Sequence, residues 1–222
     1  MQRYQLFVNC LLTLALGFQV APLYAQSQDL SVNARLLASA RNGDQAGIDR
    51  ALADGASPNA RNRLGETVLL IALKNDRPAL ARQMIDAGTD VNQAALNGVT
   101  PLMAAAHAGQ TEIVKLVLAK GADVKAEDQL KKNAMTYAAG QGQTDIVVLL
   151  LKAGVDANAV YAHDLTALMW AAGYGKTETV KTLLDAGAKA SPKDDRGKTA
   201  LDIAREGKYA ETAKLLESAG GS

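Results

Sequence analysis

The sequence predicts an all-α protein, a solenoid of stacked helix-turn-helix units joined by hairpin-like loops. The first observation behind this prediction is a period, because glycine recurs every 33 residues along the chain, at Gly55, Gly88, Gly121, Gly154, Gly187 and Gly220. The second is the composition, in which 48% of residues are hydrophobic but only 4% are aromatic. Alanine-rich helix pairs fit this composition better than a packed β protein does. A period of this length indicates units that bury their apolar faces against their neighbours.

The repeating unit is clearest over residues 98–128, where it begins with a helix start signal. The Thr100 hydroxyl can accept a hydrogen bond from an N–H group at the start of a helix, so we expect Thr100 to be the N-cap. Pro101 then occupies the first helical position, where its missing N–H costs nothing. We expect this first helix to extend through residues 102–108 and to end at a turn that Gly109 permits.

The second helix of the unit is expected over about residues 111–120. Gly121 should end it in the left-handed conformation that glycine adopts without strain. The copy at residues 131–135 lacks the Gly and the Thr of the pattern, although Asn133 can still cap the helix. We expect that repeat to be locally less stable than the others.

This unit resembles the ankyrin repeat, which has a period of 33 residues and a T-P-L-H-x-A pattern. The matching residues are Gly98 to Leu102, Ala105-Ala106, Gly109, Glu112 to Val114 and Gly121 to Val124, with further copies at Gly65 to Leu69, Leu165 to Leu168 and Gly197 to Leu201. The resemblance covers roughly residues 32 to 220 and implies about six repeats, two of them caps. The His of the pattern is absent from every copy, where its position holds Leu70, Met103, Thr136, Met169 and Asp202.

The sequence divides the chain into three segments. Residues 1–25 carry Arg3 and then a mostly apolar run, which is typical of a cleavable secretory signal with Ala25 as its last residue. A membrane anchor is the alternative, but about 15 apolar residues are few for a hydrocarbon core of ~30 Å. Residues 26–33 are polar and expected to be flexible, and residues 34–222 form the repeat domain, which begins with a degenerate repeat that serves as its N-terminal cap.

The net charge and the cysteine content of the chain indicate which partners it can bind and in which cellular compartment it works. Loss of residues 1–25 removes Arg3 from the 24 Lys and Arg residues, so that 23 remain against 23 Asp and Glu residues. A neutral chain argues against nucleic acid and anionic membranes as partners. The single cysteine, Cys10, would leave with the signal. Export without disulfides favours a bacterial periplasm, and we expect a monomer with no membrane insertion after signal cleavage.

The sequence shows no arrangement of residues suited to catalysis or to a metal. His107 and His163 fall in different repeats, and no His, Asp or Glu cluster has the spacing of zinc ligands. The run Gly173 to Thr177 lies outside the context of a phosphate-binding loop and is explained as the turn between two helices. We therefore expect no catalytic residue, no metal and no cofactor.

The resemblance implies a noncatalytic protein-binding module that uses a concave groove formed by the hairpins and the first helix of each repeat. The x position of T-P-L-H-x-A is expected to face this groove, and its column holds Ile71, Ala104, Tyr137, Trp170 and Ile203. Large aromatic side chains dominate the energetics of interfaces. We predict a binding site at Tyr137, Trp170 and Tyr174, with His107, Tyr161, His163 and Leu165 beside them. A chaperone-like role for envelope proteins is the alternative, and an enzyme is a more distant one.

Overall fold

The structure is a computed structural model that describes residues 32–220, in two compact units that divide after Ala60. The secretory signal, its cleavage site and residues 26–31 of the expected flexible segment lie outside the described residues. Each unit is described by itself below.

The smaller unit is a helix pair. Its first helix covers residues 32–42 of the described range, and α2 (Gln45–Ala53) follows after a turn at Gly43. The Asp44 carboxylate caps α2 by accepting a hydrogen bond of 2.9 Å from the N–H of Gly47. The first helix includes residues 32 and 33, so it begins before the boundary at residue 34 that the sequence suggested.

The larger unit, residues 61–220, consists of helix pairs that repeat in register. Its helices are α3 (Val68–Lys74), α4 (Pro78–Asp86), α5 (Pro101–Ala108), α6 (Thr111–Ala119), α7 (Ala134–Gln141), α8 (Thr144–Lys152), α9 (Ala167–Gly173), α10 (Thr177–Asp185), α11 (Ala200–Glu206) and α12 (Ala210–Ser218), with a short 3₁₀ turn η1 (Ala162–Asp164). The odd-numbered helices, which we call the first helices, contact one another in one row, and the even-numbered second helices form another. The prediction of an all-α solenoid is confirmed.

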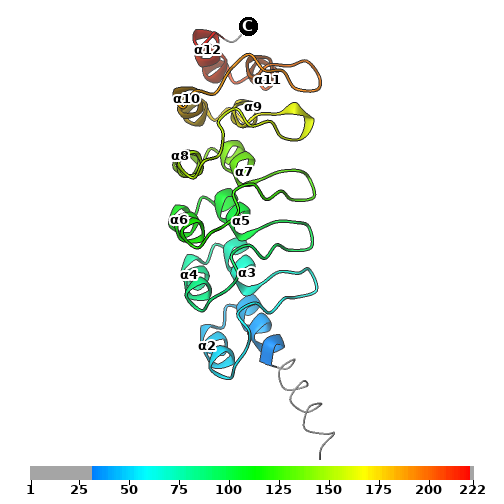
Figure 1. Cartoon of the computed structure of the whole chain (residues 1–222), viewed down its shortest axis with the longest axis vertical. Coiled ribbons are helices and arrows are strands. Elements are labelled where there is room, and N and C mark those ends of the chain that lie inside the picture. The colour runs from blue at the N-terminus through cyan, green and yellow to red at the C-terminus, as the bar shows by residue number, and fades with distance from the viewer. Residues whose placement is uncertain (1–31, 221–222) are drawn as a thin grey trace, which may run out of the picture. The chain divides into compact units, whose positions relative to one another are not determined.

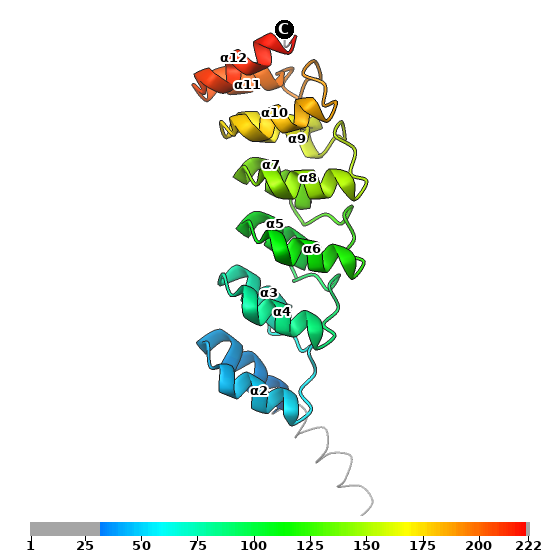
Figure 2. The same ribbon diagram turned by 90° about the vertical axis from the view of Figure 1, so that its left-hand side faces the viewer.

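The two rows leave different faces of this unit open. Figure 1 shows the loops that precede the first helices projecting from one side of their row, and Figure 2 shows the second helices along another side. We call the surface formed by the first helices and these hairpin loops the hairpin face. It contains the residues to which the sequence assigned binding.

Side-chain caps start each first helix at the predicted positions. The oxygen of the capping side chain accepts a hydrogen bond from the N–H three residues on, at Thr67, Thr100, Asn133, Thr166 and Thr199. At Asn133 the arrangement is reciprocal, because the Thr136 hydroxyl also accepts from the Asn133 N–H at 3.0 Å. The copy that lacks Gly and Thr therefore keeps its cap.

The second helices end as the glycine period predicts. Gly121 has φ 83°, and its N–H donates to the carbonyl of Leu118 while the N–H of Ala122 donates to the carbonyl of Val117. This is the Schellman arrangement, which satisfies carbonyls that the helix end would otherwise leave unpaired. The helix itself ends at Ala119, with Lys120 as its C-cap.

A similar hairpin loop precedes most of the first helices. In one of them the Asp128 N–H donates to the carbonyl of Lys132 at 2.8 Å, and the Lys131 N–H donates to the carbonyl of Asp128 at 3.0 Å. Lys131 has φ 58°, a left-handed conformation, where the equivalent residues Gly98 and Gly197 have φ 83° and 76°. A side chain in this conformation is strained, so Lys131 adopts at a cost what glycine adopts freely.

Replacing Lys131 with Gly is expected to raise the free energy of unfolding by about 0.5 to 1 kcal/mol, since relief of the left-handed strain exceeds the entropy cost of glycine. Two reverse substitutions are controls. Gly197→Ala should cost about 1 kcal/mol, because a Cβ there meets no atom within 4 Å and only the backbone is strained. Gly98→Ala should cost more, because its Cβ would lie 2.8 Å from the Cα of Asp128. Denaturant unfolding that ranks the two alanine variants in the opposite order would contradict this account.

Candidate functional site

The column of residues predicted to face the groove is only partly open. Ile71 and Ala104, on α3 and α5, are 6% and 8% exposed and therefore belong to the core. Tyr137 on α7, Trp170 on α9 and Ile203 on α11 are half-buried. The last three members of the column thus reach the surface of the hairpin face, whereas the first two do not.

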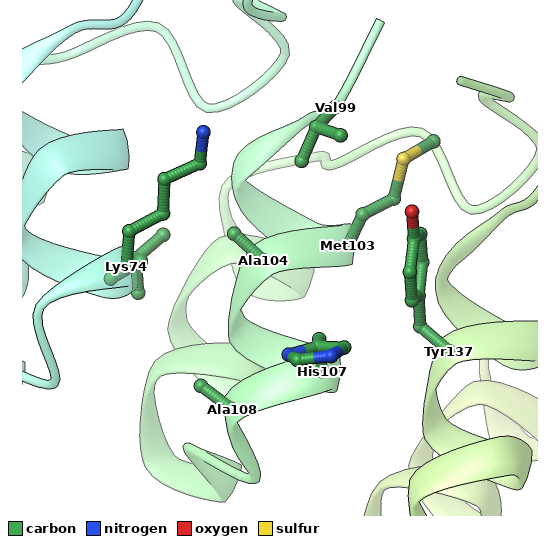
Figure 3. Close-up of a pocket in the computed structure, with 8 residues that line it drawn as sticks. Lys74, Val99, Met103, Ala104, His107, Ala108 and Tyr137 are labelled. Atoms are coloured by element: carbon green, nitrogen blue, oxygen red, sulfur yellow. The ribbon is translucent and has the colours of Figure 1, made fainter. Parts of the chain in front are cut away.

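Tyr137 contacts His107 of the preceding repeat. Their rings meet edge to face, with centroids 5.6 Å apart and an interplanar angle of 81°. Both residues line a pocket of about 320 Å³, and Figure 3 shows Met103 lying beside the Tyr137 ring. Met103 is 1% exposed, so it forms part of the floor beneath the ring.

The Tyr137 hydroxyl forms a hydrogen bond with a buried carboxylate. It donates a hydrogen bond of 2.6 Å to the carboxylate of Asp128, which is 5% exposed. Burial, this hydrogen bond and the negative charge of Asp128 all raise the pKa of Tyr137 well above its usual value. The phenol is therefore neutral at physiological pH, and its ring is fixed rather than free to reorient.

Trp170 and Tyr174 form the second aromatic pair, in the next repeat. Their rings are stacked at 10° with centroids 6.2 Å apart, and Tyr174 is 54% exposed. They lie over Gly140 of α7, where an added Cβ would be 3.5 Å from Tyr174 and 3.7 Å from Trp170. The absence of a side chain at Gly140 leaves the space in which the two rings pack.

Lys132 connects the two aromatic pairs. Its ammonium nitrogen lies 4.6 Å from the centroid of the Trp170 ring and 5.8 Å from that of Tyr137. Sequence reasoning missed this residue, because Lys132 looked like one more surface charge in a loop. The available signal was its position directly before the cap Asn133, which places it on the hairpin that flanks α7. We call Lys132, Tyr137, Trp170 and Tyr174 the central patch.

The remaining predicted residues lie on the hairpin over residues 161–165, away from the central patch. Tyr161 lines a different pocket, of about 360 Å³, whose lining includes none of the aromatic residues of the central patch. Burial is the main cause of a raised pKa at Tyr161, which the neighbouring Asn133 side chain partly opposes. Leu165 is half-buried and its carbonyl accepts from the Tyr161 N–H.

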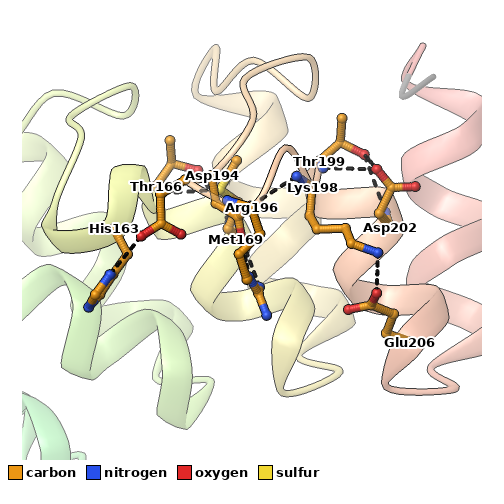
Figure 4. Close-up of polar contacts among 10 residues, drawn as sticks. His163, Thr166, Met169, Asp194, Arg196, Lys198, Thr199, Asp202 and Glu206 are labelled. Carbon is orange, nitrogen blue, oxygen red and sulfur yellow. Dashed lines mark hydrogen bonds and ion pairs between the residues drawn. The ribbon is translucent and has the colours of Figure 1, made fainter.

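His163 contacts the following hairpin instead of the aromatic residues. Its backbone is left-handed, with φ 60°, and its side chain is exposed. The Nδ1 atom lies 2.8 Å from the carboxylate of Asp195. Figure 4 labels His163 and marks this contact with a dashed line. The structure therefore groups His107 with Tyr137 and Trp170 with Tyr174, and it leaves Tyr161 and His163 elsewhere.

The C-terminal repeat of the hairpin face is rich in internal polar contacts (Figure 4). The Asp194 carboxylate accepts hydrogen bonds from the N–H groups of Arg196 and Lys198 and from the Arg196 guanidinium. Burial alone would raise the pKa of Asp194, but these hydrogen bonds and the Arg196 charge outweigh it and lower the pKa. Hydrogen bonds from Thr199 likewise lower the pKa of Asp202.

Acid is therefore expected to loosen this repeat first. A carboxylate whose pKa is lower in the folded state stabilises the fold above its unfolded pKa of about 3.9, and this stabilisation is lost as pH falls through the folded value. Hydrogen exchange of residues 194–206, compared between about pH 5 and pH 2.5, should show a larger loss of protection there than in α7 and α8. In the Asp194→Asn variant, protection of residues 194–206 should depend less on pH. If it depends on pH as strongly as in the unmodified protein, other carboxylates are responsible.

Over residues 32–220, no group of three or more His, Cys, Asp or Glu side chains is placed to hold a metal ion. In the same part of the chain no helix combines the length and the apolar character needed to cross a membrane. Gly175, in the run Gly173 to Thr177, has φ 63° and forms the turn between α9 and α10, as the sequence predicts.

Comparison with known protein families gives a match over nearly all of the described residues. The profile of a family described as "Ankyrin repeats (3 copies)" matches residues 36–128, 72–161 and 135–221, in overlapping sets. A comparison with curated proteins finds no similar relative.

Proposed function

Because this chain belongs to the ankyrin-repeat family, whose repeats indicate a protein–protein interaction module, we propose that it binds a partner protein through its hairpin face and catalyses no reaction. Proteins of this kind are generally noncatalytic. The observation that carries the choice of surface is the stacked pair of Trp170 and Tyr174, since Tyr174 exposes 54% of its surface although its ring is held against a neighbour.

Physical arguments support the central patch as the centre of this interface. Tyr and Trp are enriched among the residues that dominate binding energy, because they bury a large area at a low cost in side-chain entropy. Here both rings of each pair are already ordered, by stacking, by the Asp128 hydrogen bond and by Lys132. A preorganised surface loses little further entropy when a partner docks.

A photo-crosslinking residue placed at position 174 tests this proposal in cells. We expect it to capture one stoichiometric partner protein. The matched control places the same residue at Lys181, which is exposed on the second helix α10, away from the hairpin face. Equal capture from both positions, or many partners of low yield from position 174, would favour a chaperone-like role. A turnover screen of the purified protein checks the enzyme alternative.

We also propose that the protein works in the periplasm of a bacterium after removal of residues 1–25. The order of Arg3, the apolar run and Ala25 supports this, as does the loss of the single cysteine with the signal. Intact-mass measurement of protein from the cell envelope should give an N-terminus at Gln26 or within a few residues of it. A retained Met1 would contradict export by cleavage.

A further inference from the structure

In each outer repeat of the larger unit, one lysine on the hairpin face forms an ion pair with a glutamate of the same repeat. In the first of these repeats the Lys74 ammonium lies 2.6 Å from the Glu66 carboxylate. In the last one Lys198 and Glu206, which occupy the same two positions with the signs reversed, form the equivalent ion pair. Each pair joins a hairpin residue to a residue near the end of the following first helix.

The three repeats between these outer repeats have no such pair, and of these only the central one holds a charged residue at the hairpin position. Lys132 occupies the hairpin position of Glu66 and Lys198, but the helix position opposite it holds Gly140, which carries no carboxylate. Over residues 32–220, no ion pair within 4.0 Å engages the Lys132 ammonium, which lies instead over Trp170. The nearby Asp128 carboxylate is occupied by the Tyr137 hydroxyl and by backbone N–H groups.

The Lys132 ammonium is thus a positive charge that lies against an aromatic surface and keeps N–H donors available for a partner. An ammonium group carries three N–H donors and no acceptor, and contact with the face of a ring leaves donors on the other side available. A carboxylate that arrived there would form a charge-assisted hydrogen bond in surroundings that two aromatic rings make less polar than open solvent. Tyr174, which stacks on the same Trp170 ring and is 54% exposed, can cover an apolar group of the partner.

We propose that the hairpin face recognises an acidic segment of its partner protein, in which one carboxylate binds Lys132 and a neighbouring aromatic or aliphatic side chain packs on Tyr174. This inference rests on the proposed function and adds the chemistry of the partner. The carboxylate binds beside the aromatic rings of the central patch, because Lys132 is the cation that lies against them.

Trp170 gives this proposal a direct readout, because it is the single tryptophan of the chain. Its fluorescence should change when the protein is titrated with a random copolymer of Glu and Tyr, and the change should weaken at high salt. A copolymer of Lys and Tyr, which keeps the aromatic component and reverses the charge, should produce no saturable change. Failure of the unmodified protein to bind the Glu–Tyr copolymer would overturn the proposal.

Substitution of the lysine separates its role from general electrostatics. Lys132→Gln should weaken binding of the Glu–Tyr copolymer by about 10-fold, the effect of one charge-assisted hydrogen bond. The matched control is Lys131→Gln, which removes the adjacent lysine whose side chain is 69% exposed and pairs with Glu127. It should change binding by less than about 2-fold, because an exposed pair of this kind contributes little. Equal effects of the two variants would overturn the proposal.

The two proposals fail in different ways. If position 174 captures a partner whose affinity is the same for Lys132→Gln and the unmodified protein, the acidic chemistry is wrong while the proposed function stands. If position 174 captures nothing, the proposed function itself is wrong on this face. Circular dichroism of Lys132→Gln should match that of the unmodified protein, so that a loss of binding is not a loss of fold.

Discussion

Replacing Leu150 with Ala is expected to lower the free energy of unfolding by about 2 to 5 kcal/mol, the usual cost of a cavity of this size in a packed core. Leu150 is 0% exposed, and its helix α8 contacts α6 on one side and α10 on the other. Because both neighbouring repeats depend on α8, neither can close the cavity without disturbing its own packing. Denaturant unfolding monitored by circular dichroism measures the effect.

Two other leucines are controls for this prediction. Leu149, next to it on α8, is half-buried, so Leu149→Ala should cost clearly less. Leu216, on α12 of the C-terminal repeat, is as fully buried as Leu150. Its loss should still cost less than that of Leu150, because a terminal repeat can unfold separately and thereby limits the penalty. A larger cost at Leu216 would contradict nearest-neighbour coupling in this stack.

Replacing Trp170 with Ala is expected to weaken binding of the crosslinked partner by roughly 2 kcal/mol or more, about 30-fold in affinity, with helical content unchanged. The substitution removes the ring on which Tyr174 stacks and over which Lys132 lies, so it removes two contacts of the central patch at once. Trp170 is half-buried and lies over Gly140 rather than within the core, so the helices should remain packed.

Affinity and a thermal melt must be measured together for this variant. Tyr161→Ala is the matched control, because it removes an aromatic side chain that lines the other pocket and not the central patch. It should leave the affinity for the partner nearly unchanged. Unchanged binding in a folded Trp170→Ala protein would move the site off the central patch. A cooperative loss of folding would show instead that Trp170 serves to cover the alanine-rich helices.

Several features of the fold follow from the sequence because their causes are local. A cap at Thr100 or Asn133 needs only an oxygen three residues before a free N–H, and the left-handed turn at Gly121 needs only a residue without a Cβ. Both signals lie within a few residues of the structure they determine. Repetition every 33 residues then fixes the order of the stack, which is why the helix pairs and their ends could be predicted.

The arrangement of the candidate site depended on contacts between repeats. Tyr161 was grouped with Trp170 on the sequence, yet its side chain enters another pocket, because its neighbours are Asn133 and Val155 of the preceding repeat. The role of Lys132 follows from Gly140, which provides no carboxylate, and from Trp170 a full repeat away. Local signals in the sequence were therefore enough to predict the caps and the glycine turns of the helix pairs. Only the tertiary structure decided which side chains meet, since their directions are set by packing against residues about 33 positions away.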